Sequence, residues 1–172
     1  MQRRLSHAQE NPVTAIDIAL EPDATMVQQA EADNARLLKA YPEGFALDAT
    51  HHAHITMLQQ FVRTADLEKV YSAANAVLAK EGVPRRRLKA IRYYYIPSPP
   101  LGIAGIVVEP TEDLLRLQYE LLDAVAPFTE KTGTAAAFVS TDGGCDIQQG
   151  LIDYVANFTM VYPDSLRRRE GG

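Results

Sequence analysis

Two strand-like segments that no helix separates constrain the fold more than any other feature of the sequence. They span residues 86–96 and 103–109, and the turn-forming stretch I-P-S-P-P-L-G lies between them. A parallel pair of strands needs a crossover of a dozen or more residues, whereas so short a connection joins antiparallel neighbours. The sequence therefore predicts an α+β fold with an antiparallel sheet, and argues against a doubly wound parallel sheet.

The other segments alternate between strand and helix patterns. Residues 15–21 alternate apolar and polar side chains, as a half-buried strand does. Three further segments carry apolar residues three and four positions apart, which is typical of amphipathic helices. The predicted helices begin after Pro22, at Thr64 and at Thr111, and end near Tyr41, Gly82 and Pro127; further strands are predicted at 51–62, 135–140 and 154–162.

Composition limits the class of protein and its partners. The chain has 172 residues, of which 47% are hydrophobic and 23% charged, so we expect one soluble globular domain. A net charge of −5 argues against duplex DNA as a partner. Cys145 is the only cysteine, which rules out an internal disulfide and fits the cytoplasm. The start does not resemble a secretory signal, and no apolar run is long enough to predict a membrane partner.

A five-residue stretch occurs twice in similar form. The first copy is A-H-I-T-M at 53–57, and the second is A-N-F-T-M at 156–160. Because side chains alternate faces along a strand, His54 and Thr56 would share one face, and Asn157 and Thr159 would do so in the second copy. Two such strands side by side would bring four polar groups to one cleft, which is a reasonable way to hold a phosphate.

The H-I-T-M motif, on a strand that follows a strand and a helix, resembles the H-x-T-h motif of the two-histidine phosphoesterase superfamily. That superfamily includes 2′-5′ RNA ligase-like proteins and cyclic nucleotide phosphodiesterases. The resemblance covers the element order from about 15 to 162. It implies two pseudo-symmetric lobes of largely antiparallel sheet, with helices on the outer faces and a central cleft. Residues 1–163 would form this domain, and 164–172 a basic, flexible tail.

The resemblance also implies roles for the repeated residues. In the superfamily the two histidines are general base and general acid at a phosphodiester, and the hydroxyls hold phosphate oxygens. His54 and Thr56 match the first motif, whereas in the second Thr159 matches and Asn157 replaces the histidine. Asparagine does not titrate, although its amide can donate to oxygen, and a lost acid or base costs about 10²–10⁴-fold in rate. The superfamily usually continues beyond the second motif, so a trimmed chain and an abbreviated second lobe both stay open.

Two further features are candidate substrate contacts. His52 shares the face of His54 and can supply the missing proton, or it simply decorates the end of the strand. The segment R-R-R-L-K-A-I-R-Y-Y-Y at 85–95 combines five basic residues with three tyrosines. Arg92 and Tyr94 in it can contact phosphates and stack on bases of single-stranded RNA, or the segment is an edge strand protected by its charge.

We therefore expect a cytoplasmic protein that recognises a phosphate or phosphodiester of a nucleotide or single-stranded RNA end, without a metal or other cofactor. If it is an enzyme, it is a phosphodiesterase whose catalysis Asn157 weakens or alters. One alternative is a non-catalytic nucleotide- or RNA-binding protein on the same fold. Another is a zinc-dependent hydrolase that uses His52 and His54. Its third ligand would come from Asp48, Asp142, Cys145 or Asp146.

Overall fold

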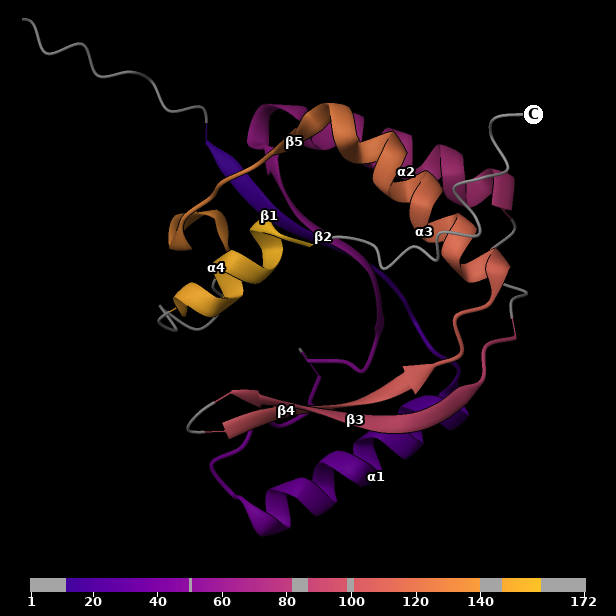
Figure 1. Ribbon diagram of the computed structural model, residues 1–172, viewed down its shortest axis with the longest axis vertical. Coiled ribbons are helices and arrows are strands. Elements are labelled where there is room, and N and C mark those ends of the chain that lie inside the picture. The colour runs from indigo at the N-terminus through magenta and orange to yellow at the C-terminus, as the bar shows by residue number, and fades with distance from the viewer. Residues whose placement is uncertain (1–11, 50, 82–86, 99–100, 140–146, 159–172) are drawn as a thin grey trace, which may run out of the picture.

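A computed structural model describes residues 12–49, 51–81, 87–98, 101–139 and 147–158. Within them the chain forms two antiparallel sheets and four α-helices (Figure 1), which confirms the α+β prediction. The larger sheet has the order β1-β2-β5, and the smaller one is the hairpin β3-β4. The strands are β1 (Val13–Leu20), β2 (Ile55–Arg63), β3 (Ala90–Ser98), β4 (Leu101–Val108) and β5 (Thr129–Glu130). The helices are α1 (Ala24–Ala40), α2 (Leu67–Glu81), α3 (Glu112–Val125) and α4 (Gln149–Ala156).

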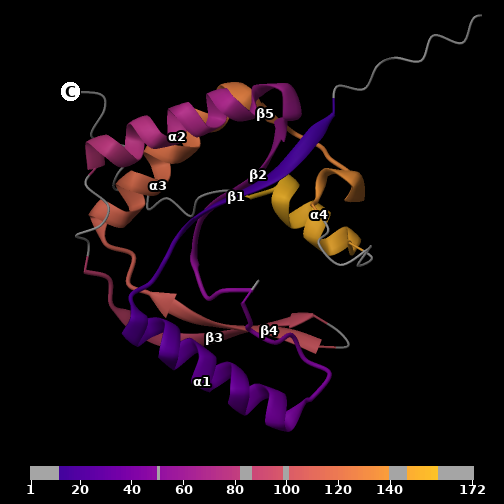
Figure 2. The same ribbon diagram turned by 180° about the vertical axis from the view of Figure 1, so that it is seen from behind.

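The helices cover both faces of the larger sheet. Helices α2 and α3 lie together on one face, and the short helix α4 lies on the other (Figures 1 and 2). The β3-β4 hairpin lies apart from this sheet, and α1 runs along the far side of the hairpin. Within the described ranges, no helix is long and apolar enough to cross a membrane.

Strand β2 supplies the centre of the core on both faces. Met57, Leu58 and Val62 pack against the apolar stripes of α2 and α3, and none of the three exposes more than 1% of its surface. Phe61 points to the opposite face, where it packs against Ile152 of α4. Burying side chains of this size contributes about 1.5–3 kcal/mol each, so β2 anchors the whole sheet.

A β-bulge at Met57 changes which side chains of β2 face the core. Ile18 of β1 pairs with Leu58, but its neighbour Ala19 pairs with Thr56, so Met57 is an extra residue in β2. Two consecutive residues, Met57 and Leu58, are therefore buried in one cluster. In a regular strand Thr56 would share the face of Leu58, two residues later. Because of the bulge, Thr56 instead faces the α4 side of the sheet.

Side-chain caps begin two of the predicted helices. Asp23 accepts a hydrogen bond from Met26 N (2.9 Å) at the start of α1, and Thr111 accepts one from Leu114 N (3.3 Å) at the start of α3. The remaining predicted helix, which lies between these two in the chain, begins with a 3₁₀ turn at Thr64–Asp66 and continues as α2. All three helix predictions are thus confirmed to within a few residues.

Two strand predictions are wrong. Residues 154–156, expected in a strand, belong to α4, because Ile152 and Val155 lie three apart and bury one helical face against Phe61. Residues 135–137, predicted as strand, form a 3₁₀ turn in which Ala137 N donates to Thr134 O (2.9 Å). Residues 138–139 and 157–158 are not in strands either, and 140 and 159–162 lie outside the described residues.

The buried position of Leu117 predicts a large cost for its truncation. Leu117 of α3 is fully buried, so Leu117→Ala should lower the free energy of unfolding by about 2–5 kcal/mol. Leu37→Ala is the matched control, because Leu37 of α1 is 52% exposed, and it should cost less than about 1 kcal/mol. Chemical denaturation of both variants measures the difference, and equal costs would contradict the assignment of the core.

Candidate functional site

Four polar side chains converge on the α4 face of the larger sheet, at the start of β2. Gln59 Nε2 donates a hydrogen bond to Asp17 Oδ2 (2.6 Å), and the two residues are direct cross-strand partners. Thr56 Oγ1 donates to the same carboxylate oxygen over 3.5 Å. His54, which immediately precedes β2, places its Nε2 3.6 Å from that oxygen. We call Asp17, His54, Thr56 and Gln59 the Asp17 cluster.

The backbone fixes the orientation of the His54 ring. Its Nδ1 lies 2.8 Å from the carbonyl oxygen of His52, and because a carbonyl only accepts, Nδ1 carries the hydrogen. The other nitrogen, Nε2, is the atom that can exchange a proton with a ligand. It lies too far from Asp17 for a hydrogen bond, and the side chain is 48% exposed. His54 therefore offers one accessible proton-transfer atom in a defined position.

Asp17 is held in place by Gln59 and Thr56. Since Gln59 donates through Nε2 to Asp17, its Oε1 must point away, and this buried oxygen has no hydrogen-bond partner within the described residues. The carboxylate thus lies beside the His54 and Thr56 atoms that a ligand would meet. Within the described ranges, no lysine or arginine nitrogen lies within ion-pair distance of Asp17.

Tyr154 lies within electrostatic range of Asp17 and of a second tyrosine, Tyr94. Tyr94 of β3 pairs with Gly105 of β4, and a side chain at Gly105 would come within 2.2 Å of the Tyr94 ring, so the glycine lets this ring lie across the hairpin. Tyr154 of α4 packs edge-on against Phe158, with ring centroids 5.8 Å apart. Burial raises the pKa of the Tyr154 phenol above its ordinary value, and the nearby Tyr94 phenol and Asp17 carboxylate add to the rise.

The predicted site residues fall into two groups. The structure brings together His54 and Thr56, and it places Tyr94 close enough to affect the ionisation of Tyr154 beside them. Arg92 is exposed and lies two residues before Tyr94 on β3, which puts both on one face of the hairpin. The prediction that His52 and His54 share a strand face is wrong, because both precede β2; His52 is exposed and contributes its carbonyl oxygen to the His54 ring.

The second copy of the repeated stretch, which contains Asn157 and Thr159, does not have the predicted structure where it is described. Asn157 ends α4 as its C-cap instead of lying in a strand, and its Nδ2 donates to Asp153 O (2.8 Å). A strand pairing of Asn157 with His54 is therefore wrong. Thr159 lies outside the described residues. The asparagine does lie three residues after Tyr154 on the same helix, a spacing that makes the two neighbours on its surface.

Sequence reasoning missed Asp17, Gln59 and Tyr154. A signal for Asp17 was present, because it is the charged residue of the alternating segment A-I-D-I-A-L. Its meeting with Gln59 depends on the β1-β2 register, and that of Thr56 depends on the bulge at Met57, neither of which has a clear sequence signature. Tyr154 was assigned to a strand, so its place on α4 could not be anticipated.

The residues that the structure describes do not assemble a metal centre of the predicted kind. Among them, no group of three or more histidine, cysteine, aspartate and glutamate side chains is arranged to hold an ion. Asp48 instead accepts hydrogen bonds from the backbone and ring nitrogens of His51 (both 2.9 Å). The other candidate ligands, Asp142, Cys145 and Asp146, lie outside the described residues.

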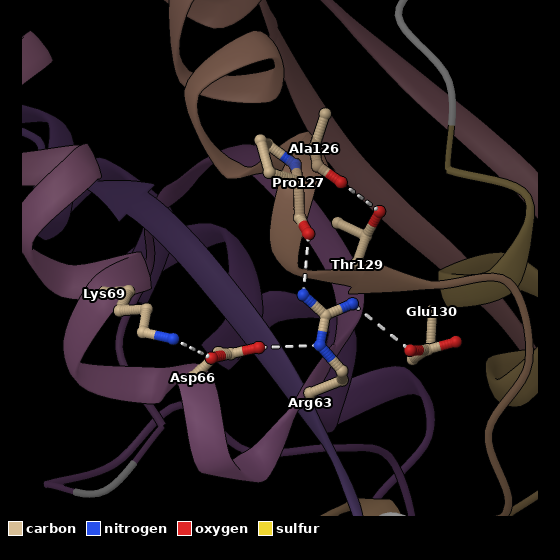
Figure 3. A network of polar contacts seen from close by, with 7 residues as sticks. All are labelled: Arg63, Asp66, Lys69, Ala126, Pro127, Thr129 and Glu130. Atoms are coloured by element: carbon tan, nitrogen blue, oxygen red, sulfur yellow. Dashed lines mark hydrogen bonds and ion pairs between the residues drawn. The ribbon is translucent and has the colours of Figure 1, made fainter.

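A second polar cluster has a structural role. Each of the three guanidinium nitrogens of Arg63, at the end of β2, donates a hydrogen bond to another residue of the protein (Figure 3). They donate to Asp66 Oδ2 (2.6 Å), to Glu130 Oε1 (3.3 Å) and to Pro127 O (2.6 Å). Hydrogen bonds from Lys69 and Arg63 lower the pKa of Asp66. Arg63 thereby ties the end of β2 to the 3₁₀ turn before α2, to the turn after α3 and to β5, and is not placed to bind a ligand.

A pocket of about 590 Å³ lies elsewhere, beside the N-terminus of α1. Its lining combines polar residues such as Glu21 and Asp23 with Leu20, Ile55 and Val108, which also pack against the core below α2 and α3. It contains none of the residues of the Asp17 cluster. The described residues that line it include two carboxylates and no basic side chain, so we do not assign the phosphate site to it.

No family model, no curated protein and no solved structure significantly matches the chain.

The ionisation of Tyr154 provides a test of this geometry. Tyr154 should titrate above the ordinary value for tyrosine of about 10, because burial favours the neutral phenol. Its contribution to stability is therefore present below about pH 10 and is lost as the pH rises through the higher pKa of the folded state. Asp17→Asn should lower the pKa of Tyr154 in part, since it removes a nearby negative charge.

Tyrosinate absorbance measures this titration as the difference between a chain and its Tyr154→Phe variant, recorded with and without Asp17→Asn. Asp123→Asn is the control, because exposed Asp123 lies on α3 across the sheet and should leave the titration of Tyr154 unchanged. A Tyr154 titration that is the same in the unchanged chain and in the Asp17→Asn variant would contradict the proximity of the two side chains.

Proposed function

We propose that this protein is a two-histidine phosphoesterase-like protein that recognises a phosphate or phosphodiester of a nucleotide or RNA end. His54 and Thr56 form the phosphate-contacting half-site, and Tyr94 and Arg92 are contacts for the rest of the ligand. We further propose a cytoplasmic protein with two pseudo-symmetric lobes, one built on the β1-β2-β5 sheet and one on the β3-β4 hairpin. The ligand cleft would lie between them.

The observation that carries this proposal is the placement of His54 and Thr56 beside each other with their functional atoms on one side of the sheet. Thr56 Oγ1 and His54 Nε2 lie 3.5 and 3.6 Å from the same carboxylate oxygen, so both atoms approach one point of the site. On binding, the Thr56 hydroxyl would turn its one hydrogen from Asp17 to a non-bridging phosphate oxygen, and Nε2 would exchange a proton with a reacting oxygen. The Nδ1–H bond to the His52 carbonyl keeps Nε2 directed to that position.

For the second half-site we propose a contact at the end of α4 in place of a paired strand. Asn157 lies one helical turn from Tyr154, and its amide has a second hydrogen that the bond to Asp153 O does not use. Thr159 would follow it. In this arrangement His54 makes one proton transfer, and water, the substrate or His52 supplies the other.

A non-catalytic phosphate-binding protein is the second candidate. Within the described residues, His54 is the one histidine whose ring joins the Asp17 cluster, and the asparagine at the second position cannot titrate. A positioned general acid and a positioned general base each raise the rate about 10²–10⁴-fold, and a site with a single imidazole lacks one of the two. The same contacts can still bind a phosphodiester.

Incubation with a nucleoside 2′,3′-cyclic phosphate tests the proposed function. His54→Ala should lower the rate of hydrolysis at least 10²-fold, because it removes the proton-transfer atom. Thr56→Val, which keeps the shape without the hydroxyl, should weaken binding of the phosphodiester about 5- to 10-fold. Product formation and ligand affinity are measured separately for each chain.

His51→Ala is the matched control, because His51 bonds to Asp48 and its ring is not part of the Asp17 cluster. It should retain the activity of the unchanged chain. Binding without turnover, lost in Thr56→Val, would favour the non-catalytic protein. Absence of both binding and turnover in the unchanged chain would rule out both candidates.

A further inference from the structure

We infer that Asp17 is a specificity-determining residue that makes this site prefer phosphodiester monoanions over phosphomonoester dianions. The inference rests on the proposed function, since it takes His54 and Thr56 as the phosphate contacts. It assigns a role to a carboxylate that is otherwise unexpected at an anion site.

Asp17 lies close enough to the proposed phosphate contacts to repel a phosphate held there. Its Oδ2 lies 3.5 Å from the Thr56 hydroxyl oxygen and 3.6 Å from His54 Nε2. A phosphate oxygen bonded to either of these atoms would lie on the order of 4–6 Å from the carboxylate, given ordinary hydrogen-bond lengths. Asp17 cannot turn away without losing the 2.6 Å bond from Gln59 across the β1-β2 ladder.

The charge of Asp17 is not neutralised by a fixed cation. Within the described residues, His54 is the only cation-forming side chain at ion-pair distance from it. The same imidazole is the group that must serve the phosphate, so it cannot cancel both negative charges. The field of the carboxylate therefore acts directly on the bound ligand.

Phosphate esters differ in how strongly they feel this field. A phosphodiester carries one negative charge, whereas a monoester carries nearly two at about pH 8, above its second pKa of about 6. At 4–6 Å in a water-like medium, each unit of ligand charge costs about 3- to 5-fold in affinity. Asp17 therefore penalises the monoester about 3- to 5-fold more than the diester. Hydrolysis of a cyclic diester yields a monoester, so the same residue weakens product binding relative to substrate binding.

A matched pair of ligands isolates this effect. A 2′-deoxynucleoside 3′-phosphate and its methyl ester differ by one methyl group and one charge, and neither can cyclise through a 2′-hydroxyl. Their dissociation constants are measured by NMR titration at about pH 8 and low salt, where screening is weak. Asp17→Asn should tighten the monoester about 10- to 25-fold and the diester about 3- to 5-fold, so the preference changes by about 3- to 5-fold.

Two controls separate charge from structure. Asp17→Glu retains the charge and should retain the preference for the diester. Asp123→Asn makes the same change in net charge on α3, across the sheet from the cluster, and should leave the ratio of the two affinities unchanged.

The outcomes distinguish this inference from the proposed function. If the unchanged chain binds the diester but Asp17→Asn leaves the ratio of affinities as it was, the role of Asp17 is refuted and the phosphate site stands. If the unchanged chain and the Asp17→Asn chain bind neither ligand, both are refuted. A ratio that changes equally in Asp123→Asn would also overturn the role of Asp17, because the effect would then follow net charge alone.

Discussion

The burial of β2 on both faces is the constraint on which the rest of the structure depends. Met57, Leu58 and Val62 fill the space below α2 and α3, while Phe61 fills the space below α4. A strand buried in this way has little freedom to slip, because a shift of one residue would turn its apolar side chains to the wrong face. That register fixes the position of Thr56, at the start of β2, and of His54, just before it.

The bulge at Met57 links this packing to the candidate site. It lets two adjacent apolar residues enter one core, and in doing so it turns Thr56 to the face that carries Asp17 and Gln59. The packing of the core therefore places the hydroxyl within hydrogen-bond distance of Asp17. Such a side chain is rigidly held, which is the property that a binding group needs if it is to position a phosphate.

The sequence predicted the parts of the fold that local patterns determine. The three longer helices follow from apolar spacing and from caps such as Asp23 and Thr111, and the β3-β4 hairpin follows from its short connection. Helix α4 was missed, because the predicted strand began at residue 154 and left out Ile152, which together with Val155 forms the helical face packed against Phe61. The resemblance between A-H-I-T-M and A-N-F-T-M added to the error, since it suggested a strand where Asn157 ends a helix.

The site was predictable only in part for a related reason. His54 and Thr56 are near neighbours in the sequence, and their spacing brought them to notice, whereas Asp17 and Gln59 are 42 residues apart and meet through strand register. Their inclusion changes the chemistry that the motif alone suggests. A histidine and a hydroxyl by themselves attract any phosphate, but the same pair beside a fixed carboxylate favours ligands of lower charge. In the proposed site, Asp17 therefore acts together with His54 and Thr56 in selecting the ligand.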